Sequence, residues 1–301
     1  MTASELDTLY IKNPSVVAVG SSKRYMLIKP KHNPLIFEPP EAAVVSRVIK
    51  FLNAEPIREA DLRSACEDLG NHFTRLLTRL VDERIIITGA RQKISSILAG
   101  LQPPSAKHSC DRLVIGVTGA VQASLIFSYL DQVYFRYCRN IEIVLTKSSL
   151  KFINPRASEY LYSTRVWIDL FKPQKNVNVP HIHLAQSADL IVVFPATAHT
   201  LHRLATGECS DLLSLVIAAT NAPVILVPAM NRAMWFYPPI QRNVSQLRED
   251  GFYIVEPGLG YEVSANLDAT LQVGGPGVDP MSLVALLDAV LSSERQVTSS
   301  E

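Results

Sequence analysis

Small polar residues follow four apolar runs of the sequence, at the point where each run ends. The runs cover residues 112–117, 141–145, 190–194 and 224–227. Glycine lets a backbone approach a phosphate closely, and hydroxyl and ammonium groups can donate hydrogen bonds to it. The first run leads into Gly-Val-Thr-Gly over 116–119, which is not the G-x-G-x-x-G pattern of dinucleotide sites. The sequence therefore favours a phosphate site for a mononucleotide.

These runs alternate with helical patterns between residues 111 and 292. Such alternation predicts an α/β fold with a parallel sheet covered by helices on both faces, Rossmann-like and of the flavodoxin type. The carboxyl ends of parallel strands share one edge, where ligands bind. We therefore expect the polar turns after the four runs to meet there.

The first 98 residues have a different pattern, and residues 99–110 (AGLQPPSAKHSC) are expected to form a linker. Strands are predicted over Ser15–Ile28 and Pro34–Phe37, helices over Glu41–Asn53, Glu59–Leu69 and Phe73–Glu83, and a strand over 84–89. This order predicts a small α+β domain similar to a winged helix. Its third helix offers Arg75 and Arg79 and little else that is basic, which argues against DNA binding. An extended peptide bound by β-augmentation and a packing or oligomerisation role remain as alternatives.

Composition limits the class of protein. The chain has 301 residues, of which 48% are hydrophobic and 19% charged, with a formal net charge of +1. Its most apolar stretch, 212–230, is interrupted by Asn221, Pro223 and Pro228, and the N-terminus lacks the pattern of a signal peptide. We expect a cytoplasmic protein without membrane or nucleic-acid partners, and a short polar tail over 293–301.

Cysteines and histidines do not predict a metal site. The four cysteines have no C-x-x-C spacing, which argues against both a disulfide framework and a thiolate zinc site. Two pairs of histidines, 181 with 183 and 199 with 202, invite a zinc interpretation, but no carboxylate partner is evident. No bound metal is expected.

Several motifs occur in an order that resembles the homo-oligomeric flavin-containing cysteine decarboxylases. These motifs are Gly-x-Thr-Gly-Ala, Thr-Lys-Ser-Ser-Leu-Lys-Phe, His-Ile-His-Leu, Phe-Pro-Ala-Thr-Ala-x-Thr and Pro-Ala-Met-Asn-x2-Met-Trp. The family includes phosphopantothenoylcysteine decarboxylases and the lantibiotic peptidyl-cysteine decarboxylases of the epidermin type. The resemblance covers residues 112–291 and does not extend to the first hundred residues.

The resemblance implies that FMN is the cofactor. The positions that match the family's flavin loops are Gly119, Ala120, Val121, Ser124, Thr146, Lys147, Ser148, Ser149, Pro195, Ala196, Thr197, Ala198, His199, Thr200 and Ala229. In the family the third loop carries an asparagine where this chain has His199. We expect the flavin site to be kept, with a changed hydrogen bond at that position.

The resemblance also implies the catalytic pair. The family's catalytic histidine falls on His181, which can act as a base because imidazole titrates near neutral pH. Its carboxylate-binding asparagine falls on Asn231, which can hold a carboxylate without neutralising it. The substrate side of the pocket is expected to involve Met230, Met234, Tyr261 and Ser264 as well as Asn231.

Departures from the family pattern indicate which substrate to expect. Phosphopantothenoylcysteine decarboxylases use a cysteine after the Pro-Ala-Met-Asn motif, and this chain has none after Cys209. Its Tyr-Glu-Val-Ser over 261–264 is closer to the epidermin type. The first domain resembles the leader-peptide recognition domains of enzymes that modify ribosomal peptides. The resemblance therefore implies oxidative decarboxylation of the C-terminal cysteine of a precursor peptide to an aminoenethiol, in lanthipeptide-type biosynthesis.

Alternative functions follow from the same fold. They are a phosphopantothenoylcysteine decarboxylase-like enzyme of coenzyme A biosynthesis, a non-catalytic flavoprotein that binds or regulates a partner, and, ranked lower, a flavin prenyltransferase. Family members form trimers, some of which assemble into dodecamers. We expect at least a trimer here, because the apolar stretches 161–170 and 212–227 exceed what one small sheet requires.

Overall fold

A computed structural model describes residues 9–12, 16–20, 25–28, 35–38, 41–52, 57–66, 70–83, 85–89, 110–171, 177–261, 271–275 and 278–298. The larger part is a parallel sheet in the order β12-β11-β10-β7-β8-β9. Its strands are β7 (Leu113–Val117), β8 (Ile141–Leu145), β9 (Arg165–Trp167), β10 (Leu190–Ala196), β11 (Val224–Pro228) and β12 (Tyr253–Val255). The predicted α/β fold is confirmed. The strands β8 and β9 are added on one side of β7, and β10, β11 and β12 on its other side. Ligands in such folds bind at this switch point, between β7 and β10.

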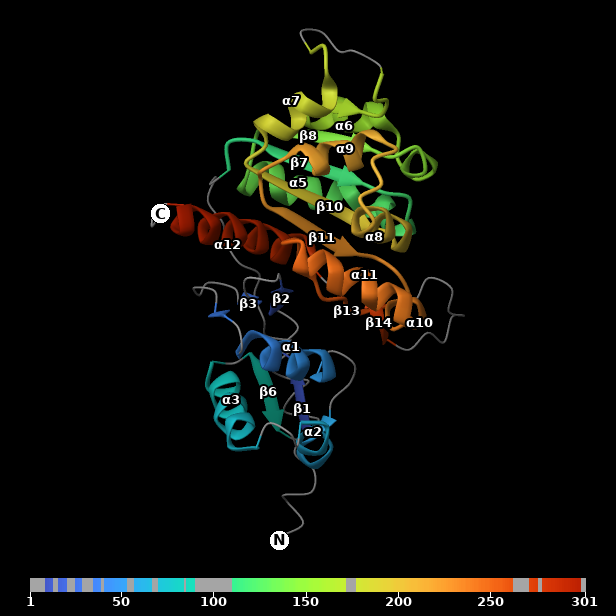
Figure 1. Cartoon of the computed structure of the whole chain (residues 1–301). Helices are drawn as coiled ribbons and strands as arrows, with labels where there is room; N and C mark the ends of the chain where they lie inside the picture. The colour runs from blue at the N-terminus through green and yellow to red at the C-terminus, as the bar shows by residue number, and fades with distance from the viewer. Residues whose placement is uncertain are drawn as a thin grey trace.

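Helices cover both faces of this sheet (Figure 1). One face is covered by α5 (Ile126–Arg136) and α12 (Pro280–Thr298), and the other by α7 (Pro180–Ser187), α8 (Ala198–Ala205), α9 (Leu212–Ala219) and α11 (Pro238–Glu249). Shorter elements are η2 (Val121–Leu125), η3 (Ser149–Lys151), α6 (Pro155–Tyr162), α10 (Arg232–Trp235) and the hairpin β13 (Gly258–Tyr261) with β14 (Leu271–Gly275). Within the described ranges, no helix has both the length and the apolar content needed to cross a bilayer.

Alternation along β7 explains how both faces are filled. Leu113, Ile115 and Val117 belong to the core beneath α5 and α12, whereas Val114 belongs to the opposite core. Gly116 lies against α9, because a Cβ placed there would be only 2.5 Å from Cδ1 of Leu213. Helix α9 can therefore pack directly on the first strand.

The first segment contains β1 (Leu9–Lys12), β2 (Val17–Gly20), β3 (Tyr25–Ile28), β4 (Leu35–Phe37), β5 (Ile57–Arg58) and β6 (Ile86–Gly89), with helices α1 (Glu41–Leu52), α2 (Glu59–Ala65) and α3 (Gly70–Asp82). The helices pack around a core of their own, in which Leu62, Leu80 and Ile49 are fully buried. Strands β5, β1 and β6 form a small antiparallel sheet. Helices appear where the apolar spacing predicted them, each ending at or before its expected last residue.

Strands β2, β3 and β4 join the large sheet. Strand β2 pairs antiparallel with β12, and the full order is β4-β3-β2-β12-β11-β10-β7-β8-β9. In Figure 1 these strands lie between α12 and the first three helices. The predicted division at 99–110 thus separates two segments that share one sheet, and all of that linker except Cys110 lies outside the described residues.

At the other end of the chain, the tail predicted from residue 293 differs from the structure. Helix α12 continues to Thr298, and Ser293 is buried. Leu286 and Val290 repeat at helical spacing on the buried face of this helix, and the buried Ser293 continues that face past residue 292.

Candidate active site

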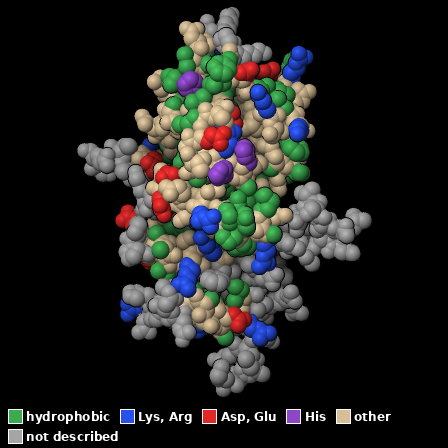
Figure 2. Space-filling view, turned by 45° about the vertical axis from the view of Figure 1, so that its right-hand side comes forward, with side chains coloured by type: hydrophobic (Ala, Val, Ile, Leu, Met, Phe, Trp, Pro, Cys, Tyr) green, Lys and Arg blue, Asp and Glu red, His purple; other side chains and the backbone are tan. Residues whose placement is uncertain are grey.

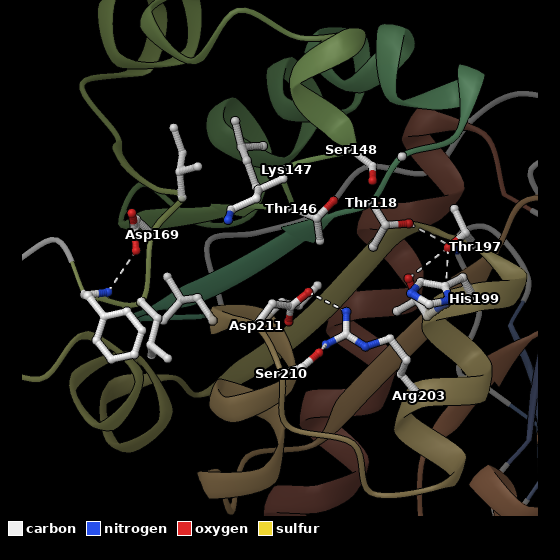
Figure 3. A pocket seen from close by; sticks show the side chains of 18 residues that line it. Thr118, Thr146, Lys147, Ser148, Asp169, Thr197, His199, Arg203, Ser210 and Asp211 are labelled. Carbon is white, nitrogen blue, oxygen red and sulfur yellow. Dashed lines mark hydrogen bonds and ion pairs between the residues drawn. The ribbon is translucent and has the colours of Figure 1, made fainter.

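A cavity of about 580 Å³ lies at the carboxyl ends of the central strands. It is lined by Thr118, Gly119, Leu145, Thr146, Lys147, Ser148, Ile168, Asp169, Leu170, Phe171, Thr197, His199, Thr200, Arg203, Ser210, Asp211, Leu212 and Leu213 (Figure 3). Of the four turns expected to meet, those after β7, β8 and β10 line one cavity, and none of residues 228–231 after β11 lines it. Its volume is in the range of sites for small molecules and cofactors.

The first two turns touch each other at Gly119. A Cβ built on Gly119 would lie 2.4 Å from Cβ of Ser148, with backbone atoms of Ser148 at 3.1 and 3.3 Å. No side chain fits between the turns at that distance. Glycine at this position therefore lets the turns after β7 and β8 form one continuous wall.

Thr118 joins the ends of β7 and β10. Its hydroxyl donates to the carbonyl of Pro195 at 2.7 Å and accepts from the backbone N–H of Thr197 at 3.1 Å. The side chain is buried. Thr118 thus fixes the position of the third turn relative to the first, and sequence reasoning did not single it out.

The third turn begins helix α8. The Thr197 hydroxyl caps the helix by accepting from the N–H of Thr200 at 3.2 Å, and the two hydroxyl oxygens are 2.9 Å apart. His199 occupies the first turn of α8, is exposed, and lines the cavity. Capping orients this turn, while His199 and Thr200 present their side chains to the cavity.

A charged network on the same wall was missed by the sequence analysis. Arg203 of α8 pairs with Asp211 at 2.7 Å and Glu208 at 3.1 Å, and donates to Ser210 and Ser214. Burial opposes ionisation of Asp211, but the backbone N–H of Ser214 and the Arg203 guanidinium lower the pKa of its carboxyl. Asp211 and Ser214 also form a capping box at the start of α9. An Asp-x-x-Ser sequence before an apolar run is the signal that predicts such a helix start.

The opposite wall is mostly apolar. Ile168, Leu170 and Phe171 follow β9 and line the cavity together with Leu212 and Leu213. Phe171 is 87% exposed, and its backbone N–H donates to Asp169. Strand β9 itself was not predicted, because it has only three residues and begins with the exposed Arg165.

Other predicted cofactor residues lie near the cavity without lining it, among the described residues. Ser149 is fully buried and donates to the Thr146 carbonyl at 2.7 Å, and Ser124 donates to the Val121 carbonyl. Both hydroxyls therefore stabilise their own turns. The remaining positions of this kind are Ala120, Val121, Pro195, Ala196, Ala198 and Ala229.

His181 and His183 lie in helix α7. Two residues apart in a helix, their side chains point to different sides. His183 lies 3.6 Å from the Glu142 carboxylate, which also accepts from the Trp167 ring N–H. Nδ1 of His181 is buried and has no hydrogen-bond partner among the described residues. No three metal-ligating side chains gather in the part of the chain that the structure describes.

Asn231 lies at the end of β11 and caps the short helix α10. Its side-chain oxygen accepts from the N–H of Met234 at 2.9 Å, which leaves the amide nitrogen as an outward donor. Met230 and Trp235 pack in the core, whereas Met234 is 44% exposed. Of the other predicted substrate positions, Tyr261 lies in β13 and Ser264 lies outside the described residues.

A single chain therefore does not bring the predicted catalytic pair to the cavity. Neither His181 nor Asn231 is among the described residues that line it. The predicted flavin positions that do line it are Gly119, Thr146, Lys147, Ser148, Thr197, His199 and Thr200.

Fold and cavity together define an α/β protein that binds a mononucleotide cofactor at a sheet switch point. A family model described as Flavoprotein matches residues 101–272, more than half of the chain, and the chain belongs to this family. The resemblance read from the motifs is confirmed, and FMN is the family's cofactor.

Coenzyme A biosynthesis proteins are similar to part of the chain. The coenzyme A biosynthesis bifunctional protein CoaBC of Bacillus subtilis is 39% identical over 122 residues, which is 40% of this chain and 30% of that protein. A CoaBC protein of Vibrio vulnificus is 32% identical over 59% of this chain and 43% of its own length. The chain thus spans less than half the length of these relatives.

Solved structures agree with the fold. PPC decarboxylase, as a cysteine-to-serine mutant complexed with pantothenoylaminoethenethiol, aligns with a TM-score of 0.51 at 25% identity, over 63% of this chain and 99% of that chain. MrsD from Bacillus sp. HIL-Y85/54728 was also similar, at a TM-score of 0.50 and 25% identity; the alignment covers 60% of this chain and 96% of that one.

The residues present fit FMN. Hydroxyl and ammonium donors at Thr146, Lys147 and Ser148 adjoin Gly119, where the backbone is accessible, and these groups suit a phosphate. Polar groups on the α8 side and the apolar wall after β9 suit the two edges of a flat ring system. The close contact at Gly119 explains why no side chain fills the space between the first two turns.

Proposed function

We propose that this protein is an FMN-dependent decarboxylase of an acylated cysteine, with a pantothenoyl-cysteine compound as its substrate. The observation that carries the proposal is the convergence of three turns at the cavity, in a chain related to CoaBC proteins. The ligand named for PPC decarboxylase, an aminoethenethiol, is what an acylated cysteine becomes when it loses CO2 and two hydrogens.

This substrate differs from the peptide that the sequence favoured. Similarity to CoaBC proteins supports the coenzyme A interpretation better than the lanthipeptide interpretation. The weight given to the first domain and to the cysteine missing after position 209 led the sequence analysis toward a peptide. Neither feature identifies a substrate. One is an added domain and the other a missing cysteine, and the family's chemistry is the same for both substrates.

The chain's own residues would divide the work as follows. Lys147, Ser148 and Thr146 would hold the phosphate of FMN, and the α8 wall with His199 would hold the ring edge. Bound FMN would supply a two-electron oxidant. The free amide N–H2 of Asn231 would hold the substrate carboxylate as a neutral donor, so that the negative charge needed for loss of CO2 is kept. The imidazole of His181 would take up a proton from the substrate.

An oligomer would complete this site. His181 is flanked by exposed Val179 and Ile182, and Tyr160 and Leu161 of α6 are also exposed. Such apolar side chains are suited to subunit contact. The prediction that residues 212–227 form an interface is wrong, because Leu212, Leu213 and Val216 are buried in the chain's own core. We therefore assign the expected trimer to contacts by α6 and α7.

Subunit mixing tests this arrangement directly. His181→Ala and Asn231→Ala should each lack decarboxylation, and a mixture allowed to exchange subunits should regain part of it if the two residues act from different subunits. Sedimentation velocity supplies the oligomeric state. An active monomer would contradict the proposal of a shared site.

A peptide ending in cysteine is the second candidate substrate. Strand β4 is an edge of the described sheet, carries the exposed Ile36, and lies beside α3, whose Arg79 guanidinium stacks over the Phe37 ring. An edge strand with an exposed apolar residue is suited to β-augmentation by an extended peptide. This edge would recruit a peptide to the FMN site.

Mass spectrometry distinguishes the two substrates. The FMN-loaded protein is incubated separately with pantothenoylcysteine, its phosphorylated form and peptides ending in cysteine. Loss of about 46 Da, CO2 plus two hydrogens, indicates an enethiol product, whereas about 44 Da indicates decarboxylation without net oxidation. Because the chain has no cysteine after position 209, we expect 46 Da. Turnover of peptides alone would replace the first candidate by the second, and turnover of none would refute the decarboxylase assignment.

A further inference from the structure

Strand β8 carries the single charged side chain of the buried parallel strands β7, β8, β10 and β11. This residue is Glu142, which is only 4% exposed. Side chains alternate between the two faces of a sheet. Ile141, Ile143 and Leu145 belong to the core beneath α5 and α12, whereas Val144 belongs to the core on the other face. Glu142 therefore points, with Val144, toward the face that α7 and α9 cover.

Two side chains from different elements surround this carboxylate. The ring N–H of Trp167 in β9 donates to Oε2 of Glu142, and Nε2 of His183 in α7 lies 3.6 Å from its Oε1. The two rings are also neighbours, with centroids 6.0 Å apart. Burial of a carboxylate is costly unless it is paired and hydrogen-bonded. The carboxylate of Glu142 therefore links two strands of the sheet to α7.

The contact between Glu142 and His183 has the distance of an ion pair and not of a hydrogen bond. At 3.6 Å it exceeds the range of hydrogen bonds, and Nε2 of His183 is buried without such a bond among the described residues. No lysine or arginine of the described ranges forms an ion pair with Glu142. A protonated His183 therefore supplies the positive charge that the buried carboxylate needs.

Helix α7 is held differently at its two ends. Near its last turn, the Thr220 hydroxyl donates to the carbonyl of Ala185 at 2.9 Å. At its start, no side chain caps the helix. His183 lies between His181 and the anchored end. Among the described residues, its contact with Glu142 is thus the polar side-chain contact of α7 that lies nearest to His181.

We propose that Glu142 and His183 are positioning residues for His181, which rests on the proposed function, in which His181 takes up the substrate proton. Residues two apart in a helix lie about 200° apart around its axis. A tether on His183 therefore sets the rotation of α7 and, with it, the direction of the His181 imidazole. A rotation of about 20° moves a group about 6 Å from the axis by about 2 Å. Misplacement of a reacting group by about 1 Å can lower a rate about 100-fold.

Two substitutions remove this tether in different ways. Glu142→Gln keeps an acceptor for the Trp167 ring and removes the negative charge, so the unfolding midpoint should stay close to that of the wild type. His183→Phe leaves the carboxylate buried without its cation and should lower the midpoint. Both should lower kcat about 100-fold. KM and the dissociation constant of FMN should stay close to wild-type values, because neither residue lines the cavity.

A conservative variant and a control on the same helix separate positioning from general damage. His183→Lys keeps a cation beside Glu142 and should recover part of kcat. Gln186→Ala changes an exposed residue of α7 and should leave kcat unchanged. A merely structural role predicts that kcat falls only where the unfolding midpoint falls. Wild-type kcat in Glu142→Gln, or no recovery in His183→Lys, would therefore overturn the proposal.

Hydrogen exchange of the α7 amides tests the tether apart from the reaction. It is measured by mass spectrometry on the FMN-loaded full chain without substrate. Exchange should be faster in Glu142→Gln and His183→Phe than in the wild type and Gln186→Ala, and slower again in His183→Lys. Equal exchange in all variants would overturn the tether even in an active enzyme. Faster exchange in a protein that decarboxylates no cysteine compound would support the tether and refute the proposed function together with the role of His181.

Discussion

Substitution of Gly119 by alanine should separate the first two turns of the FMN cavity. The new Cβ would lie 2.4 Å from Cβ of Ser148, a distance that non-bonded carbon atoms do not tolerate. Two further contacts, at 3.1 and 3.3 Å, are with backbone atoms of Ser148, so a change of rotamer cannot relieve them. The turn after β7, the turn after β8, or both must move.

Overpacking of this kind costs about 1–3 kcal/mol. The strain is relieved when the turns move apart, and FMN must pull them together again on binding. If the cost falls on the bound state, the dissociation constant of FMN should rise about 5- to 150-fold. Ser148→Gly deletes the shortest contact but also the hydroxyl proposed to hold the phosphate, so the single variant is needed as a reference. Gly119→Ala should weaken FMN binding less in the Ser148→Gly background than in the wild-type background.

Titration of the apoprotein, followed by quenching of FMN fluorescence, measures the effect. Gly251→Ala is the control for general destabilisation, because Gly251 has a positive φ of 96° and no atom within 4 Å of a built Cβ. It should lower the unfolding midpoint and leave FMN affinity unchanged. Wild-type FMN affinity in Gly119→Ala would refute the reasoning, as would an equal effect of Gly119→Ala in the wild-type and Ser148→Gly backgrounds.

Three further experiments test other parts of the structure. Burial lowers the pKa of Lys12 from 10.5 to about 8, although the Glu256 carboxylate raises it. The unfolded chain then holds this proton more tightly, so the free energy of unfolding should rise by about 3 kcal/mol between pH 8 and pH 10.5. Urea unfolding of Lys12→Met over the same pH range should lack that rise. A double-mutant cycle of Arg203→Met and Asp211→Asn should give a coupling of about 1 kcal/mol in the free energy of unfolding, because the Asp211 side chain is 33% exposed and the pair is partly screened by water. Additive effects of the two substitutions would contradict the ion pair. Asn231→Asp should keep the α10 cap and lose decarboxylation, whereas Asn231→Ala should lose both the activity and about 1 kcal/mol of stability; an active aspartate variant would remove Asn231 from carboxylate binding.

Local pattern predicted the strands and turns that carry the site. Strands β7, β8, β10 and β11 are buried along their whole length, so they are visible as continuous apolar runs. Where such a run ends in a parallel sheet, the following turn must lie at the ligand edge. The convergence at Gly119 and Thr197 follows from that rule.

Long-range contacts were not predictable in the same way. The sequence indicates strands over 15–28 and 34–37, but nothing in them shows that β2 would pair with β12, more than two hundred residues later. Arg203 was missed for a similar reason, since its partners Asp211 and Ser214 belong to the next helix. The roles predicted for His181 and Asn231 came from motif resemblance. A motif indicates what a residue does, but not whether it acts in the site of its own chain or in that of a neighbouring subunit.

The joint between β2 and β12 links the first segment to the FMN site mechanically. Glu256, directly after β12, is buried, pairs with Arg248 of α11, and donates its backbone N–H to the carbonyl of Ala18 in β2. Loss of either partner of a buried ion pair leaves an uncompensated charge, which costs more than the pair contributes. Since β12 adjoins β11, whose end carries Asn231, the first segment protects the sheet edge next to a predicted substrate residue. Any role of β4 in holding a peptide would therefore act through a sheet continuous with the active site.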